Sequence, residues 1–448
     1  MRLVGWLGGL GAAAAGYGVF QFLFEVLPDI GTGPARYLLA GVSGLGTAAT
    51  TWLAAALVRA RAQAADAGGG ARRTPAGYAA QPAPGKLPEL LASAHARLAE
   101  QVSEFNDPVR GPLVGWPHSL GEPHEDTARP TSVGTAYGLH LMLDLGVPDG
   151  RLRTGELVET LWRLRLPDGG WSARSQGSMA RPEVTALVLG ALARAGVSGE
   201  RLAAEVERCE AGFTHELDRA GRALTHVVTT VLRGLLRASP GSATIPVLRD
   251  ALVAGAVSDP DRRHRHCWSH RLSPLPWPSP AARPSPAHTA QAVVALDRVT
   301  RVLGEGSAAR TAREDGIRWL LACPAAAHDG CPDLANRREE VRRPHPDDTG
   351  HHEVLNVRHF TAAWVLRALL TPGARELARE EGLEREWQDR LNGAAAAVWA
   401  GQTDGIWSWT RDGAGLAATE DLHQPMWMTY QGLSALRAHA VWMYQPNA

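Results

Sequence analysis

Residues 166–192 read LPDGGWSARSQGSMARPEVTALVLGAL, a glycine-rich turn that ends in Trp171 followed by an apolar segment that runs from Thr185. The same arrangement recurs along the chain, with a helical pattern before each turn and an apolar helix after it. The other turns are Gly115-Trp116, Cys267-Trp268, Asp329-Gly330-Cys331 and Asp404-Gly405-Ile406-Trp407. The apolar helices are predicted to begin at Thr135, Thr185, Thr229, Thr289, Thr361 and Thr429.

A two-helix unit repeated at this spacing predicts a helical array. The threonines stand 44 to 72 residues apart, and only the segment at Thr229 lacks a turn before it. Periods of this size are typical of helix-pair repeats, which bury their apolar faces against their neighbours. Six pairs can close on themselves. We therefore expect an all-α fold, an (α/α)6 toroid with an inner and an outer ring of helices, over residues 87–448.

The residues of the recurring turn have structural explanations. Glycine after aspartate permits the positive φ of a tight turn. The tryptophan can cover the end of the neighbouring helix, and the threonine can cap the helix that follows. We expect these tryptophans to tie successive repeats together rather than to bind a ligand.

The N-terminal residues differ from the rest of the chain. Residues 4–27 and 37–58 are almost free of charge, and each is close to the roughly 20 residues that cross a bilayer as a helix. A signal peptide is the alternative for the first stretch, but the second favours a transmembrane hairpin over residues 1–60. The arginines that flank the hairpin favour cytoplasmic termini, and hence a two-pass protein of the cell (inner) membrane with a cytoplasmic globular domain. Residues 61–86, rich in Ala, Gly and Pro, are expected to be a flexible linker.

The charge balance bears on partners. The chain has 46 Lys and Arg against 46 Asp and Glu, a formal net charge of zero. Such a balance gives no electrostatic basis for binding nucleic acid. The bilayer is the partner that the sequence predicts most directly.

The turn Gln402-Thr403-Asp404-Gly405-Ile406-Trp407 resembles the repeat of squalene–hopene cyclases and of protein prenyltransferase β subunits. The resemblance extends over residues 87–448 and is weakest in the third repeat. It implies a toroid around an apolar cavity, which Trp162, Trp364, Trp427 and Tyr430 would line. A shared fold does not by itself imply a shared reaction.

The acid motif of the terpenoid cyclases is degenerate in this chain. Class II terpenoid cyclases carry paired aspartates before the threonine of an inner helix, whereas the three residues before each threonine here are SVG, PEV, HVV, PAH, RHF and MWM. Glu183 stands where the catalytic aspartate would be, but it is also explained as a carboxylate favoured near a helix N-terminus. Asp347 and Asp348 form a second candidate pair, within a polar stretch that also fits a solvated loop.

Two stretches suggest metal ligands, and zinc is the cofactor they would suit. Asp329 and Cys331 match by letter the zinc ligands of the prenyltransferases, with His288 or His359 as the third ligand; an accidental match is the alternative. His264, His266, Cys267 and His270 lie within seven residues and resemble a metal site. The arginines among them favour instead a solvated basic loop, or a loop that binds an anion.

Two functions remain open on the sequence alone. In one, the decayed motifs indicate a binding, adaptor or sensor module at the membrane, with the polar insertions 258–287 and 323–358 as recognition loops for a protein partner. In the other, the chain is an isoprenoid or lipid cyclase, or a prenyltransferase-like enzyme, whose substrate comes from the bilayer.

Overall fold

The structure is a computed structural model. It describes residues 86–120, 129–145, 154–173, 179–215, 217, 223–259, 261–272, 283–304, 306–322, 331–344, 352–410 and 422–444. The chain divides into two compact units, Met1–Gly77 and Tyr78–Ala448, and the described residues all belong to the second. The predicted transmembrane hairpin and residues 61–85 of the linker lie outside the described residues. None of the described helices is long and apolar enough to span a bilayer.

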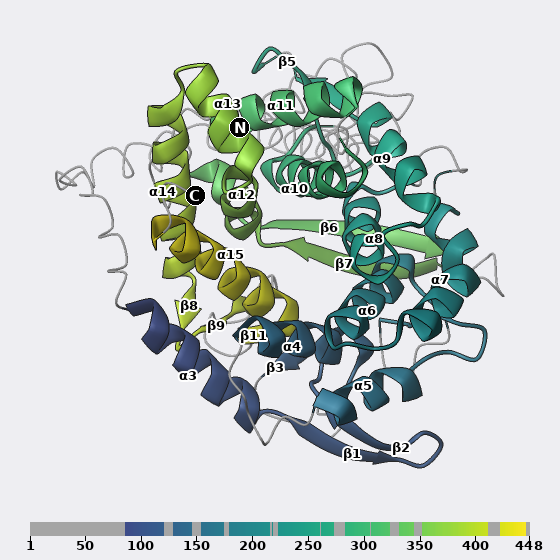
Figure 1. Cartoon of the computed structure of the whole chain (residues 1–448). Coiled ribbons are helices and arrows are strands. Elements are labelled where there is room, and N and C mark those ends of the chain that lie inside the picture. Colours follow the sequence, from purple (N-terminus) through teal and green to yellow (C-terminus); the bar gives the residue numbers. More distant parts are fainter. Residues whose placement is uncertain are drawn as a thin grey trace, which may run out of the picture. The chain divides into compact units, whose positions relative to one another are not determined.

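Six helices of the second unit form a closed ring among the described residues. They are α4 (Ser132–Leu145), α6 (Pro182–Arg194), α8 (Thr225–Ala238), α10 (Pro286–Leu303), α12 (Thr361–Leu369) and α15 (Met426–Tyr444). Each contacts the next in this order, and α15 packs back onto α4 (Figure 1). The ring confirms the prediction of a helical α/α toroid.

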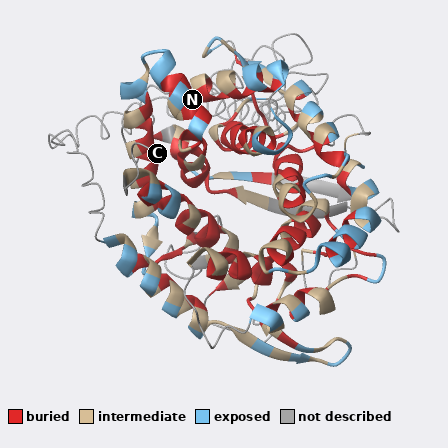
Figure 2. Cartoon of the chain, viewed as in Figure 1, coloured by how far each residue is buried: buried red, intermediate tan, exposed pale blue. Residues whose placement is uncertain are grey.

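Seven further α-helices pack around this ring. They are α3 (Lys86–Glu100), α5 (Thr154–Arg163), α7 (Gly199–Thr214), α9 (Thr244–Ala254), α11 (Ser307–Leu321), α13 (Pro372–Glu380) and α14 (Glu384–Ala400). Burial separates the two sets: the inner helices are buried over most of their length, whereas the outer helices alternate buried and exposed residues (Figure 2). An amphipathic outer helix and a nearly all-apolar inner helix are the expected patterns for these positions.

The sequence predicted almost no strands, and this prediction is wrong. Antiparallel hairpins connect several helices: β1 (Ser103–Asp107) with β2 (Gly111–Gly115), β4 (Val257–Asp259) with β5 (His264–Cys267), and β8 (Gln402–Thr403) with β9 (Ile406–Trp407). A small sheet joins β10 (Trp409–Thr410), β11 (Leu422–Pro425) and β3 (Ser119–Leu120).

The longest hairpin pairs β6 (Arg337–Pro344) with β7 (His352–His359), and in the view of Figure 1 it crosses the middle of the ring. It lies in the insertion 323–358 that the sequence presented as a polar loop. Its first strand, RREEVRRP, carries too many charges to show the apolar alternation by which strands are recognised.

The tryptophans of the recurring turn join the outer helices to the inner ones. Trp116, Trp171, Trp268 and Trp407 are fully buried. Each indole Nε1 donates a hydrogen bond to a carbonyl near the end of the preceding outer helix. The acceptors are Leu98 O at 2.9 Å, Leu161 O at 2.5 Å, Leu252 O at 2.8 Å and Val398 O at 2.9 Å.

The backbone of each tryptophan is bound to the next inner helix. Its amide donates to a threonine hydroxyl: Thr135 at 3.3 Å, Thr185 at 3.1 Å, Thr289 at 3.1 Å and Thr429 at 3.4 Å. The sequence suggested that these threonines are N-caps, and this prediction is wrong. Each of them is the fourth residue of its helix. Close approach explains the glycine before the tryptophan: a Cβ on Gly170, at φ +70°, would lie 2.7 Å from Thr185 Oγ1.

We expect Thr185→Val to lower the free energy of unfolding by about 1–3 kcal/mol, because it leaves the buried Trp171 amide without its acceptor. Thr361→Val is the matched control. The fifth repeat has Cys331 where four of the other repeats have tryptophan, and Thr361 Oγ1 is buried with no hydrogen-bond partner among the described residues. Urea unfolding of both variants tests this, and equal losses would contradict the role assigned to the hydroxyl.

Candidate metal centre

A cluster of buried polar side chains lies at the N-terminal ends of three neighbouring inner helices. His226 is the second residue of α8, His288 the third residue of α10, and His359 comes two residues before α12. His270, which follows β5, and Glu339 of β6 complete the cluster. All five residues are buried, each with a relative exposure of 8% or less.

Glu339 is the centre of the cluster. Its Oε2 accepts hydrogen bonds from His270 Nδ1 at 2.5 Å and from His359 Nε2 at 3.0 Å. His288 Nε2 lies 3.0 Å from Oε1, in ion-pair contact but outside hydrogen-bond geometry. Arg337 Nε also approaches Oε1, at 3.3 Å. One carboxylate thus meets three imidazoles that come from different parts of the fold.

The imidazoles also contact one another. The ring centroids of His288 and His359 are 4.8 Å apart, and His226 lies 5.7 Å from His359 and 6.4 Å from His270. Two sets of three residues place their ligand atoms within 4.8 Å of one another, and Glu339 belongs to both. The sets are His288 with Glu339 and His359, and His226 with His270 and Glu339.

Hydrogen bonds on the far side of two rings fix their orientation. Ser285 Oγ lies 2.7 Å from His288 Nδ1, and Gln291 Nε2 lies 3.1 Å from His359 Nδ1. The Nε2 atoms of both histidines are therefore the ones directed at Glu339. Partners of this kind orient metal-bound histidines and set their tautomer in known metal sites.

The electrostatics of the cluster follow from its burial. Burial lowers the pKa of His288 to about 4, and the nearby Glu339 only partly offsets this. Burial alone would raise the pKa of Glu339, but the hydrogen bonds from His270 and His359 and the close approach of His288 outweigh it and hold the pKa below its ordinary value. Glu339 is therefore an ionised carboxylate beside a neutral His288, the protonation states in which both residues bind metals.

This donor set fits a transition metal ion. Imidazole nitrogens and a carboxylate oxygen are ligands of Zn²⁺, which prefers four of them. The five residues offer more donors than one tetrahedral ion needs. Entry of the ion would replace the protons that now join the imidazoles to Glu339.

The metal site predicted at His264, His266, Cys267 and His270 is not assembled in the structure. His266 Nδ1 lies 2.6 Å from Asp315 Oδ2, and the Cys267 thiol donates to Val257 O at 3.0 Å. His264 is on β5 and half-buried. Of the four, only His270 belongs to the cluster around Glu339.

The zinc ligands suggested by the prenyltransferase resemblance are also separated. Asp329 lies outside the described residues, and the Cys331 sulfur is contacted by Arg390 Nη1 at 3.4 Å. His288 and His359 are part of a candidate metal site, but with Glu339 rather than with Cys331.

Of the three candidate acids, only Glu183 belongs to the described residues. Glu183 is the second residue of α6, and its Oε1 lies 4.0 Å from Arg181 Nη1. Asp347 and Asp348 fall between β6 and β7, outside the described residues. Their catalytic role stays a prediction.

The four aromatic residues predicted to line a cavity occupy different places. Tyr430 borders a small cavity inside the ring, and Trp364 stacks on two arginines beside it. Trp427 contacts Trp409, with centroids 6.4 Å apart. Trp162 lies on the outer helix α5, where it packs against Trp171 and under the guanidinium of Arg201 at 3.8 Å.

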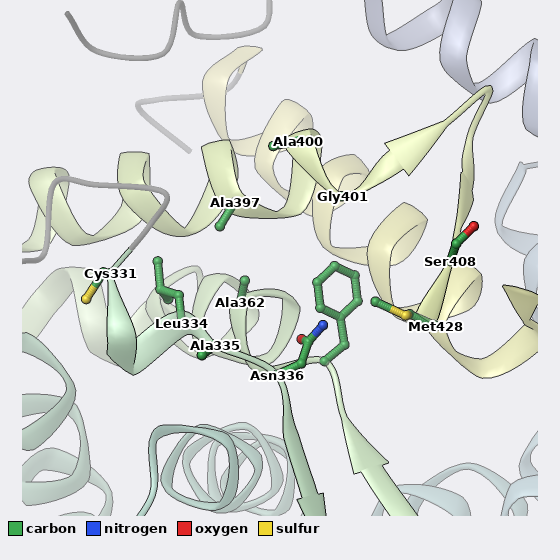
Figure 3. Close-up of a pocket in the computed structure, with 11 residues that line it drawn as sticks. Cys331, Leu334, Ala335, Asn336, Ala362, Ala397, Ala400, Gly401, Ser408 and Met428 are labelled. Carbon is green, nitrogen blue, oxygen red and sulfur yellow. The ribbon is translucent and has the colours of Figure 1, made fainter. Parts of the chain in front are cut away.

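A roomier pocket lies elsewhere among the described residues, near the ends of α12 and α14 (Figure 3). It encloses about 450 Å³ and is wide open to solvent. Small side chains such as Ala362, Ala397 and Ala400 line it, together with Phe360 and Met428. This lining lacks the converging charged groups of a catalytic site.

Sequence analysis did not identify His226 and Glu339 as site residues, although a signal for His226 was present. The segments before three consecutive threonines, HVV, PAH and RHF, each contain one histidine, namely His226, His288 and His359. Neighbouring inner helices of a ring bring such positions together. Glu339 had no comparable signal, since it lies in a charged strand whose pairing was not predicted.

No known family model matches this chain, and neither does any curated protein sequence. Several solved structures are similar. A sugar epimerase from a ruminal bacterium has a TM-score of 0.49 at 11% identity, covering 80% of this chain and 98% of that one. A family 76 glycoside hydrolase (mannosidase) from Bacteroides thetaiotaomicron has a TM-score of 0.44 at 9% identity, covering 80% and 100%. The unsaturated glucuronyl hydrolase of Bacillus sp. GL1 has a TM-score of 0.41 at 12% identity, covering 78% and 96%.

These comparisons correct the family expected from the sequence. The four similar structures compared are glycoside hydrolases and a sugar epimerase, and none of these four is a terpenoid cyclase or a prenyltransferase. The turn motif on which the resemblance rested is explained by the packing of helix pairs. The predictions of an adaptor module and of an isoprenoid cyclase or prenyltransferase rested on that resemblance and are wrong with it. Similarity at this level transfers neither a reaction nor a substrate to this chain.

Tyr430 provides a test of the electrostatics inside the ring. Burial alone would raise its pKa, but Arg237 and Arg367 outweigh burial and lower the pKa to about 8. We expect absorbance at 295 nm to show one phenol that ionises near pH 8, and Tyr430→Phe to abolish this step. Tyr137→Phe is the control, since burial raises the pKa of Tyr137 to about 12. A step near pH 8 that survives in Tyr430→Phe would contradict the assignment.

Ionisation of Tyr430 also makes the free energy of unfolding depend on pH. The pKa of Tyr430 is lower in the folded chain than the unfolded value of about 10. Its contribution to the free energy of unfolding is therefore fully present above pH 10 and is lost as the pH falls through 8.

Proposed function

We propose that this chain is a metal-dependent enzyme of the (α/α)6 toroid type, with one Zn²⁺ ion bound by Glu339 and the histidines around it. The observation that carries the proposal is the convergence of three imidazole nitrogens on one buried carboxylate, each within 3.0 Å. A fourth imidazole, that of His226, completes a second set of three ligands with His270 and Glu339.

The free energy lost by burying these polar groups supports a functional role for the cluster. Burying one carboxylate and four imidazoles sacrifices their hydration, and apolar residues of similar volume would stabilise the ring at least as well. Clusters of buried titratable groups with perturbed pKa values are concentrated at functional sites. A zinc ion held there would polarise a substrate oxygen or a water molecule, so metal-assisted hydrolysis is the reaction class that we propose.

Metal content measured by mass spectrometry tests the site. We expect one equivalent of zinc in the purified full-length protein, and Glu339→Gln and His359→Ala to weaken binding by more than the roughly 10- to 100-fold that loss of an outer partner costs. His266→Ala is the matched control, because His266 is bound to Asp315 instead. A protein that takes up no metal, or one that loses it equally in His266→Ala, would contradict the proposal.

We also propose that residues 1–60 anchor the protein in the membrane, with the lipid bilayer as its partner and the globular unit on the cytoplasmic side. The nearly uncharged stretches 4–27 and 37–58 support this. Full-length protein should stay in the membrane fraction after alkaline carbonate washing, and a chain that begins at residue 78 should not. Release of the full-length protein by carbonate would refute the anchor.

A further inference from the structure

A second group of charged residues lies in the ring, about two to three helical turns from the histidines. Arg233 and Arg237 are on α8, Arg298 on α10 and Arg367 on α12. Arg233 and Arg367 both lie over the Trp364 ring, with guanidinium-to-centroid distances of 4.5 and 5.0 Å. Three of the six inner helices thus contribute arginines to one region.

These arginines have no acidic partners within the described part of the chain. Arg233 donates only to Thr229 O and Thr230 Oγ1 of its own helix. Arg367 Nη1 is buried and has no hydrogen-bond partner among the described residues. The nearby carboxylate, Asp144, is already bound to Arg194 at 2.6 Å and to Arg437 at 3.4 Å.

The pKa values reflect this uncompensated charge. Burial lowers the pKa of Arg233 to about 10, and repulsion from Arg367 adds to the effect. Burial lowers the pKa of Arg298 as well, and Arg367, Arg237 and Arg233 lower it further. Several like charges brought together out of water are unfavourable, and proteins pair such groups with an anion.

A small cavity is enclosed by this region. Tyr137, His140, Arg233, Arg237 and Tyr430 border it, from α4, α8 and α15. Its free space is about 20 Å³, room for about one water molecule. A tetrahedral oxyanion is larger than this space, so its binding requires the bordering side chains to move, and its negative charge would offset the repulsion between the arginines.

His140 offers a donor to the same cavity. It is fully buried, and Arg194 Nη1 lies 3.3 Å from its Nδ1. Arginine can only donate, so Nδ1 accepts and the proton of the neutral ring is on Nε2. This Nε2 makes no hydrogen bond of good geometry to a described residue, although the Leu187 carbonyl is close. His140 thus adds a neutral N–H donor to the arginines that border the cavity.

We propose that the interior of the ring binds a tetrahedral oxyanion, of the phosphate or sulfate class, between Arg233, Arg237 and His140, which border the cavity, and Arg367, which shares the Trp364 ring with Arg233. Guanidinium groups match such oxyanions with paired N–H donors, and several of them balance a charge of two. A phosphate or sulfate ester is the substrate class that follows. This last step rests on the proposed function: His226 and Arg233 are seven residues apart on α8, which places the anion site about 10 Å along the helix from the metal centre.

Thermal unfolding of the full-length, chelator-treated protein tests the oxyanion site without the metal. We expect potassium phosphate or sulfate to raise the melting midpoint by about 2 °C or more above potassium chloride of equal ionic strength. We expect titration calorimetry with inorganic phosphate to show a dissociation constant at least tenfold weaker in Arg367→Met. Arg249→Met is the control, since its partner Asp250 is exposed, and it should bind like the wild type.

Two further results separate the oxyanion site from a structural role of the arginines. Without phosphate, Arg367→Met should unfold at the same or a higher temperature than the wild type, because one repelling charge is gone. In the wild type, phosphate should raise the pH at which Tyr430 ionises. Any of three results would overturn the proposal. The melting midpoints could be equal in phosphate, sulfate and chloride, Arg249→Met could lose as much phosphate binding as Arg367→Met, or acetate could bind more tightly than phosphate. The metal is absent from all these experiments, so a negative result refutes the oxyanion site and does not bear on the zinc site. A protein that binds phosphate but no zinc would refute only the zinc site.

Discussion

The double hydrogen bond of the turn tryptophans is the interaction on which the described fold depends. In four repeats one residue donates from its indole to an outer helix and from its backbone to a threonine of the next inner helix. Both ends are buried, so water cannot replace either partner. The tryptophan therefore fixes the distance and the rotation between the two helices of a pair. Repetition of this link sets the inner helices side by side until α15 meets α4.

Closure of the ring has a consequence for the polar residues that it encloses. The starts of α8, α10 and α12 lie next to each other, so His226, His288 and His359 converge without any proximity in sequence. The hairpin of β6 and β7 then brings Glu339 among them. Further along the same helices the arginines accumulate charge that no described carboxylate neutralises. The interior is thus polarised, with a carboxylate and imidazoles at the helix starts and guanidinium groups beyond them.

The sequence predicted the helix pairs and the ring because the recurring turn and the inner-helix threonines carry local signals. Packing of Trp171 against Thr185 involves residues fourteen positions apart, and such contacts leave a visible pattern. The centre could not be predicted in the same way. Glu339 reaches His270 across 69 residues, and its strand looks like a charged loop. The apparent cluster from His264 to His270 was misleading for the converse reason. Strand β5 ends at Cys267, so His266 lies in the strand against Asp315, whereas His270 lies beyond the strand and reaches Glu339.

The central claim is that Glu339 and the histidines around it hold one zinc ion. X-ray absorption at the zinc edge of the purified full-length protein tests it most directly, because the spectrum reports the identity and distance of the ligands. The account predicts a first shell of four to five nitrogen and oxygen atoms at about 2.0–2.2 Å, with imidazole features and no sulfur. A sulfur atom at about 2.3 Å would place the ion at a cysteine such as Cys267 or Cys331. That result, or the absence of zinc from a zinc-saturated preparation, would contradict the account.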